Sequence, residues 1–270
     1  MAPTHLERIV AGVREDLEAR KAAAPFRDVV GRARANAARR DIRARLADRP
    51  GIIAEIKRAS PSRGWIRRDL DAALAARVYA NAGACAVSVL TEGRRFGGSL
   101  ADLEAASGVC GPVPVLRKDF VLDEYMLAES RAFGGDLVLL MVSVLGDRTE
   151  RMVDLARRHG LEPLVEVRDE REMEIAAAAG ATVVGINNRD LATLRVDLSV
   201  SERLLPLAPP GAIKVVESGI ATRDDVLRFR ALGADAFLVG EALVRSADPG
   251  EALRRLTGRA DVSGREKEQA

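Results

Sequence analysis

The sequence has few cysteines, histidines and aromatic residues. Two cysteines, Cys85 and Cys110, and two histidines, His5 and His159, are too few and too scattered to predict a disulfide framework or a metal centre. Six Phe, two Tyr and one Trp offer little surface on which nucleic-acid bases could stack. We therefore expect no metal, no disulfide and no nucleic-acid partner.

An excess of one charge and long apolar runs are also absent. The 42 basic and 40 acidic side chains leave a formal charge of +2, and the basic residues are interspersed with acids. This pattern indicates a solvated surface rather than a track for a polyanion. No apolar run approaches the roughly 18 residues of a membrane span, and the start MAPTHLERIV carries charges where a signal peptide is apolar. We expect a cytoplasmic protein with no membrane partner.

The segment before residue 51 is predicted to be a helical extension. Thr4 and Glu7 have the spacing of a capping box, and apolar residues follow at helical spacing until Pro25 interrupts the pattern. A second helical stretch, rich in Arg and Ala, is predicted over about 26–48, before Pro50 and Gly51. The extension therefore covers residues 1–50.

Eight short, mostly β-branched apolar runs follow the extension. They lie at 52–57, 85–90, 113–118, 136–142, 162–167, 182–187, 213–218 and 236–240. Their composition is that of parallel strands buried on both faces, and each interval has room for a helix. Several of these helices end at a glycine, such as Gly83, Gly180 and Gly233, which suits a left-handed helix end.

The alternation of strand and helix predicts an α/β fold, a single (β/α)8 barrel over 51–258. With its extension, the barrel forms one domain over 1–258, followed by a polar tail over 259–270. A doubly wound open sheet is the main competing fold. It is disfavoured because no GxGxxG motif follows the first strand.

The predicted strands end in ionisable or amide side chains. In a barrel these ends face the active site, and here they carry Glu55, Lys57, Lys118, Glu166, Asn187 and Glu217. A single one of these side chains is readily explained as a structural ion pair. Converging charges above an apolar interior shift one another's pKa values, however, as general acid–base catalysis requires. The whole set therefore predicts a catalytic site.

Lysine is rare in this chain, with five residues against 37 arginines. Lys57 and Lys118 are two of the five, and both end predicted strands. Lysine retained where arginine is the usual cation indicates a need for a titratable or compact charge. Lys214 begins the seventh strand, on the opposite rim, and is interpreted as structural.

Three further features suggest a ligand pocket, although each also has an ordinary structural explanation. Ser218-Gly219 and Gly240 follow the last two strands, where barrels hold phosphate on backbone N–H groups; a tight turn explains them equally well. The first loop, from Arg58 to Gly64, includes Ser60 and either folds over a ligand or merely connects two elements. Apolar residues at or just after strand ends line a pocket or belong to the core: Phe96, Phe120, Leu139 and Leu191.

Seven sequence blocks, in this order, resemble indole-3-glycerol phosphate synthases. They are AEIKRASPSRG, TEGRRFGGS, VLRKDF, PLVEV, GINNRDL, VVESGI and LVGEAL, and they span about 50–245. The N-terminal helices are similar to the extension that this family places before its first strand. The resemblance implies a lyase of tryptophan biosynthesis, which closes the ring of 1-(2-carboxyphenylamino)-1-deoxyribulose 5-phosphate and releases carbon dioxide and water. No cofactor is implied.

The resemblance also implies roles for individual residues. Lys118 matches the general acid, Glu166 matches the base for dehydration, and the pair Glu55 and Lys57 matches a position where lysine contacts substrate anions and can share the acid role. The remaining matches are to substrate-orienting positions (Asn187, Arg189, Glu217 and, in the first loop, Ser60), to the slot for the anthranilate ring (Phe96, Phe120, Leu139, Leu191) and to the phosphate end (Lys57, Ser218, Gly219, Gly240). Glu241 departs from the family, because some members have a serine there that donates a hydrogen bond to the phosphate.

Two other functions remain open at this point. A different phosphate-binding barrel, such as phosphoribosylanthranilate isomerase, moves protons between carbons without losing carbon dioxide, but it would not require EIKRASPS. An inactive barrel that serves as a binding subunit would be free to lose its ionisable strand ends. We expect a monomer whose partner is a phosphorylated small molecule, and the chief acid is either Lys57 or Lys118.

Overall fold

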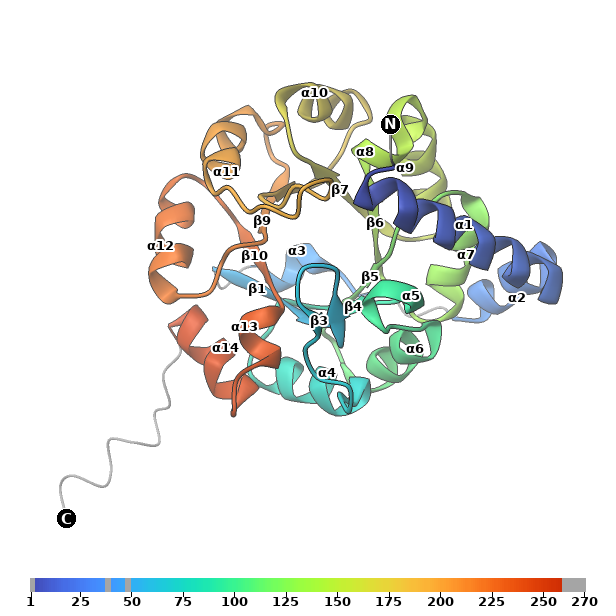
Figure 1. Ribbon diagram of the computed structural model, residues 1–270, viewed down its shortest axis with the longest axis horizontal. Coiled ribbons are helices and arrows are strands. Elements are labelled where there is room, and N and C mark those ends of the chain that lie inside the picture. The colour runs from blue at the N-terminus through green and yellow to red at the C-terminus, as the bar shows by residue number, and fades with distance from the viewer. Residues whose placement is uncertain (1–2, 37–39, 47–49, 259–270) are drawn as a thin grey trace, which may run out of the picture.

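The computed structural model describes residues 3–36, 40–46 and 50–258, so the predicted tail over 259–270 lies outside the described residues. Eight parallel strands close into a barrel, which confirms the predicted (β/α)8 fold (Figure 1). In order around the barrel they are β1 (Gly51–Ile56), β4 (Ala86–Leu90), β5 (Val115–Lys118), β6 (Leu137–Met141), β7 (Glu162–Val167), β8 (Val183–Asn187), β9 (Ile213–Glu217) and β10 (Ala236–Val239). β10 pairs with β1 and closes the ring.

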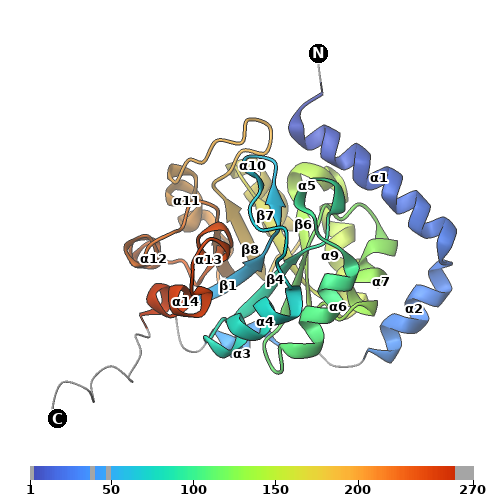
Figure 2. The same ribbon diagram turned by 60° about the horizontal axis from the view of Figure 1, so that its bottom comes forward.

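Helices surround the barrel on its outer side (Figures 1 and 2). The longer ones are α4 (Ala72–Asn81), α6 (Leu100–Val109), α7 (Glu124–Ala132), α9 (Thr149–Arg158), α10 (Glu170–Ala178), α11 (Ser199–Leu204), α12 (Arg223–Ala231) and α14 (Pro249–Thr257). Shorter elements are α5 (Gly93–Phe96), α8 (Val142–Leu145), α13 (Glu241–Val244) and the 3-10 turns η1 (Gly146–Arg148) and η2 (Leu205–Leu207). Within the described ranges, no helix is long and apolar enough to cross a membrane.

Local sequence signals set where these helices begin and end. Six of them, α4, α6, α7, α10, α12 and α14, start after an Asp, Ser or Thr whose side chain accepts a backbone N–H of the first turn. Gly83, Gly180 and Gly233 have φ of 92°, 66° and 97°, the left-handed conformation that the sequence predicts before β4, β8 and β10. Each turn then leads directly into a buried strand.

The strand register places the ionic side chains in one layer at the carboxyl end of the barrel. Glu166 pairs with Met141 on β6 and with Gly185 on β8, and Asn187 pairs with Glu217 on β9. Because side chains alternate along a strand, residues two positions earlier, such as Leu164, point into the same interior and fill it. The polar layer therefore rests on a packed apolar core.

The N-terminal extension is helical, but its second part is shorter than the sequence predicts. α1 (His5–Ala23) follows Thr4 with both capping-box hydrogen bonds, as expected. Of the helix predicted over about 26–48, the described residues form α2 (Phe26–Ala35) and a single turn, α3 (Ile42–Arg45), while 37–39 and 47–49 lie outside the described residues. Between them, the Arg40 N–H donates to Asp136 Oδ1 at 3.1 Å, and the Arg40 guanidinium binds Asp136 and the carbonyl of Val113. These contacts hold Arg40, which is not helical, against the barrel.

α1 is fastened to α7 and reaches the carboxyl end of the barrel (Figure 1). The Tyr125 hydroxyl donates to the carbonyls of Arg20 and Ala24 at 3.1 and 3.0 Å, and Arg20 Nε lies 2.7 Å from Glu129 Oε1. At its other end α1 buries Ile9. The extension thus helps to enclose the space above the strands.

The first loop folds into a small hairpin that the sequence did not predict. β2 (Ala59–Ser60) pairs antiparallel with β3 (Gly64–Trp65). Arg58 anchors the base of this hairpin by two hydrogen bonds to the Asp102 carboxylate, at 2.7 and 2.8 Å. The turn of the hairpin is therefore held beside the carboxyl ends of the strands.

Candidate active site

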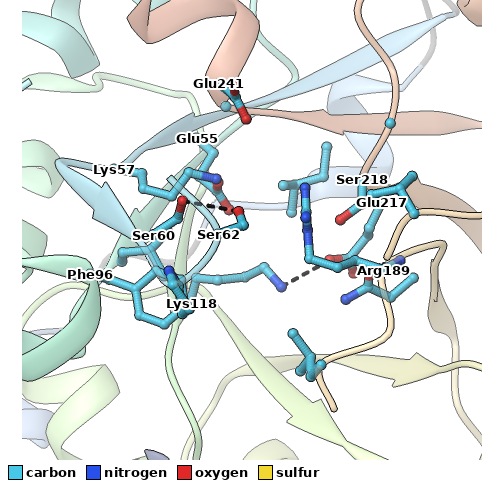
Figure 3. Close-up of a pocket in the computed structure, with 18 of the residues that line it drawn as sticks. Glu55, Lys57, Ser60, Ser62, Phe96, Lys118, Arg189, Glu217, Ser218 and Glu241 are labelled. Carbon is cyan, nitrogen blue, oxygen red and sulfur yellow. Dashed lines mark hydrogen bonds and ion pairs between the residues drawn. The ribbon is translucent and has the colours of Figure 1, made fainter. Parts of the chain in front are cut away.

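A cavity of about 510 Å³ opens at the carboxyl ends of the strands (Figure 3). All fifteen residues that the sequence predicts for the site line it: Glu55, Lys57, Ser60, Phe96, Lys118, Phe120, Leu139, Glu166, Asn187, Arg189, Leu191, Glu217, Ser218, Gly219 and Gly240. The structure therefore brings these residues together around one cavity, and the role of each stays a prediction.

Lys118 lies between two carboxylates at the centre of this cavity (Figure 3). Its Nζ is 2.9 Å from Glu217 Oε2 and 3.1 Å from Glu166 Oε2. Burial by itself lowers the pKa of Lys118, but the surrounding carboxylates, Glu217 foremost, outweigh burial and raise that pKa above its ordinary value. The side chain is thus held as an ammonium that points into the cavity.

Glu217 is the most deeply buried acid of the site, with 1% of its surface exposed. Its Oε1 has no hydrogen-bond partner among the described residues, and it lies where a Cβ on Gly185 would overlap it. Burial raises the pKa of Glu217 to about 7, against the opposing charge of Lys118. Glu217 can therefore bind or release a proton near neutral pH.

A second lysine–carboxylate pair stands at the end of β1. Lys57 Nζ lies 2.5 Å from Glu55 Oε1, and the Glu55 carboxylate is buried. Gly240, which follows β10, is the neighbour that makes room for it, because a Cβ there would overlap Glu55 Oε1. Glycine at position 240 therefore has two explanations. It makes room for the buried Glu55 carboxylate, and it lets a ligand approach the backbone N–H groups.

Apolar side chains form a slot beside Lys118. The Phe96 and Phe120 rings lie 6.1 Å apart at 42°, and Leu139 and Leu191 line the same cavity. Phe96 is held in place by Glu92, whose carboxylate accepts three backbone N–H groups, including that of Phe96 at 2.9 Å. Such a slot suits a flat, apolar ring.

The turn that follows β9, on the other side of the cavity, has a strained backbone. Ser218 and Gly219 have φ of 64° and 87°, and for Ser218 this left-handed conformation is unfavourable. The Asn188 amide donates to the Ser218 carbonyl at 3.0 Å and helps to hold the turn. The Arg189 guanidinium donates to the Leu194 carbonyl at 3.0 Å, within the loop that follows β8.

Some lining residues were not predicted from the sequence. They include Ile9 from α1, the segment Pro61–Arg63 from the hairpin turn, Leu194, Val196 and Arg245. Arg63 belongs to the SPSRG block, so the sequence could have predicted that it lines the site. No sequence pattern near Ile9 indicates a role in the site, because its position depends on how α1 packs. Glu241 also lines the cavity, 3.2 Å from Arg63 Nε.

The charged side chains that line the cavity balance one another. Five are cations: Lys57, Arg63, Lys118, Arg189 and Arg245. Five are acids: Glu55, Asp119, Glu166, Glu217 and Glu241. Such a set, whose strand-end carboxylates are buried above an apolar interior, suits acid–base chemistry on an anionic small molecule.

A closed parallel barrel with ionisable side chains at the carboxyl ends of its strands is the architecture of a (β/α)8-barrel enzyme. The family model for indole-3-glycerol phosphate synthase matches residues 6–256. The chain belongs to this carboxy-lyase family. This confirms the resemblance noted in the sequence and excludes the alternative that the chain is a phosphoribosylanthranilate isomerase.

Individual relatives agree with this assignment. An indole-3-glycerol phosphate synthase from Nocardioides is 49% identical over 255 residues, which cover 94% of this chain and 98% of the relative. The protein of that name from Mycobacteroides abscessus is 45% identical over 256 residues, with 94% and 93% covered. A solved thiamine phosphate pyrophosphorylase from Pyrococcus furiosus shares the fold, with a TM-score of 0.60 at 16% identity over 81% of this chain and 97% of its own.

Proposed function

We propose that this protein converts 1-(2-carboxyphenylamino)-1-deoxyribulose 5-phosphate into indole-3-glycerol phosphate, carbon dioxide and water, the ring-closing step of tryptophan biosynthesis. The observation that carries the proposal is the Lys118 ammonium, held 2.9 and 3.1 Å from two carboxylates beside an apolar slot. The reaction needs a proton donor next to a bound aromatic ring, and this arrangement supplies one.

Ring closure is the step in which Lys118 acts as general acid. The aromatic carbon that bears the carboxylate attacks the ketone, and the electron pair of the C=O bond moves onto oxygen. Lys118 gives its proton to that oxygen, which becomes a hydroxyl. The ammonium is placed where negative charge develops, and it stabilises the transition state more than the neutral ketone.

Loss of carbon dioxide follows without an external electron acceptor. The ring-closed intermediate is an iminium, so the electrons of the breaking C–CO₂ bond flow to the positively charged nitrogen and restore the benzene ring. Neighbouring apolar walls, from Phe120 and Leu139, favour this charge-neutralising step. The chemistry uses the substrate's own nitrogen, so the protein needs no cofactor for it.

Dehydration completes the indole ring. Glu166 takes a proton from the carbon beside the nitrogen, while the hydroxyl on the adjacent carbon accepts a proton from a lysine and leaves as water. Lys57, paired with Glu55, and Lys118, paired with Glu217, are the two lysines that line the cavity. The two protons that the lysines give leave in the water molecule, and they are replaced by the proton that Glu166 took and by one from solvent. The negative charge of Glu217 beside Lys118 favours this reprotonation.

The remaining site residues orient the substrate in this proposal. The anthranilate ring lies in the slot of Phe96, Phe120, Leu139 and Leu191, and Asn187, Arg189 and Ser60 contact polar groups of the substrate. Lys57 and the backbone of Ser218, Gly219 and Gly240 hold the phosphate. Each of these fifteen residues comes from one chain, so we propose that a monomer is the active unit, within one domain over 1–258 and in the cytoplasm.

The decisive test is turnover by the purified protein. The carboxyphenylamino deoxyribulose phosphate is added without cofactor, and indole fluorescence is followed as the ring closes. A rising signal with wild-type protein, and none with Lys118→Ala, is the expected result. A folded wild-type protein that gives no signal would instead be an inactive barrel, and the ionisable strand ends would then need another explanation.

A further inference from the structure

Glu241 joins two arginines that come from different parts of the chain. Its Oε1 lies 3.2 Å from Arg63 Nε and 3.5 Å from Arg245 Nη1. Arg63 belongs to the turn between β2 and β3, whereas Arg245 directly follows α13. All three side chains line the cavity, and Figure 3 shows Glu241 above Glu55 and away from Phe96.

Four of the five cations that line the cavity are already paired with carboxylates: Lys57, Lys118, Arg63 and Arg245. Five acids already face five cations, and the substrate of the proposed function, on which this inference rests, adds a phosphate ester of −1.5 to −2 charges and a carboxylate. Lys57 and Lys118 are paired with buried carboxylates. Arg189 donates to the Leu194 carbonyl and has no carboxylate partner among the described residues, whereas Arg63 and Arg245 become fully available to a phosphate when Glu241 releases them.

Among the ion pairs of the cavity, those of Glu241 cost the least free energy to break. The side chains of Arg63 and Arg245 are 61% and 63% exposed, and that of Glu241 is 31% exposed, so these pairs lie partly in water and contribute little stability. Lys57 contacts the phosphate while it stays beside Glu55, because moving it away would leave a buried carboxylate unpaired, which is far more costly. A phosphate offers three acceptor oxygens and a larger charge than Glu241, in the geometry that guanidinium groups bind best.

We propose that Arg63 and Arg245 are phosphate-binding residues, and that Glu241 holds their guanidinium groups at the cavity until the substrate phosphate displaces its carboxylate. Glu241 follows Gly240, one of the proposed backbone contacts, so its carboxylate stands beside the phosphate position. The two arginines and Glu241 should then affect phosphate binding in opposite directions. A purely structural ion pair gives no such reversal.

The test uses inorganic phosphate as the probe and equilibrium dialysis as the measurement. Arg63→Gln and Arg245→Gln should each raise the phosphate dissociation constant by roughly tenfold, as loss of one charge-assisted contact does. Glu241→Gln should lower it by about threefold, because the competing charge is weak and exposed. Glu251→Gln is the matched control: it removes the same charge from a comparable pair with Arg255 on α14, outside the cavity.

Steady-state kinetics with the full substrate provide the second measurement. The arginine variants should raise KM and change kcat by no more than about twofold, since a distant phosphate contact binds ground and transition states alike. The proposal is overturned if Glu241→Gln matches Glu251→Gln or weakens phosphate binding, or if the arginine variants bind phosphate as tightly as wild type.

The two proposals fail separately. Dialysis does not require turnover, so an inactive wild-type protein with the expected dissociation constants would contradict the proposed reaction and support the phosphate site. Turnover by wild type, combined with dissociation constants that the three cavity variants leave unchanged, would overturn the phosphate site and support the reaction.

Discussion

Lys118 and Glu217 form an ion pair of 2.9 Å in which only one carboxylate oxygen of the glutamate is engaged; the other has no hydrogen-bond partner in the described part of the chain. An unsatisfied, buried carboxylate oxygen costs stability. It also leaves a free acceptor beside the proposed acid. The arrangement is what a proton-transfer site requires and what a purely structural ion pair avoids.

The first prediction concerns the proposed acid. Lys118→Ala should lower kcat by about 10²- to 10⁴-fold, the usual contribution of general acid catalysis, with little change in the circular dichroism spectrum. Lys214→Ala is the matched control, since it removes a lysine at the opposite end of a strand. Activity within a few-fold of wild type would move the acid role to Lys57.

The second prediction concerns pH and stability. Burial raises the pKa of Glu217 from 4.5 to about 7, so the folded protein favours the protonated carboxyl more than the unfolded chain does. Its contribution to stability is therefore fully present below about pH 4.5 and is lost as the pH rises through about 7. Urea unfolding of wild type and Glu217→Gln should show wild type losing stability relative to the variant across this window. A difference that is independent of pH would mean that Glu217 stays ionised throughout.

The third prediction concerns the space that Gly185 leaves for Glu217. Gly185→Ala should lower kcat and destabilise the protein by about 1–3 kcal/mol, because the new methyl group overlaps the carboxylate. Adding Glu217→Ala should recover part of the stability, a coupling that a double-mutant cycle measures. Gly108→Ala, on α6 with open space around it, should instead be neutral or stabilising. Additive effects of the two substitutions would show that they do not share this space.

The fourth prediction concerns Arg117, which precedes Lys118 on β5 and is 1% exposed. Its guanidinium contacts Asp119 at 3.0 Å and Glu129 at 3.4 Å, and Glu129 also binds Arg20 of α1. Arg117→Met should cost about 3 kcal/mol or more, because it leaves the buried Asp119 carboxylate without its cation and removes one of the two arginines that bind Glu129.

Thermal or urea unfolding measures the effect of Arg117→Met. Arg27→Met is the control, since it removes an arginine from an exposed pair with Asp28 and should change stability by no more than about 1 kcal/mol. Equal effects of the two substitutions would mean that the buried network does not hold β5 to the extension.

The sequence predicted which residues share the site because, in a barrel, the position of a residue along its strand decides at which end of the barrel it lies. Residues that end parallel strands meet at one rim, so Glu55, Lys118, Glu166 and Glu217 could be grouped without knowing any contact. Strand composition alone set the limits of the eight strands to within about two residues.

Other features were beyond sequence reasoning, because tertiary contacts decide them. Arg40 binds Asp136 and interrupts a stretch whose composition favours helix. The β2–β3 hairpin depends on the anchoring of Arg58 by Asp102. Ile9 lines the cavity only because Tyr125 and Glu129 fasten α1 across α7. None of these partners is near in sequence, so no local pattern predicts them.

Closure of the barrel between β1 and β10 also has a consequence for biosynthesis of the chain. Glu55 is among the first site residues to leave the ribosome, yet its pocket is completed by Gly240, close to the end of the barrel. A nascent chain that stops before β10 carries Glu55 and Lys57 on an unpaired sheet edge, open to water and to other chains. Catalytic competence can therefore arise only after nearly the whole barrel has been synthesised, and truncated products should be inactive and prone to aggregate.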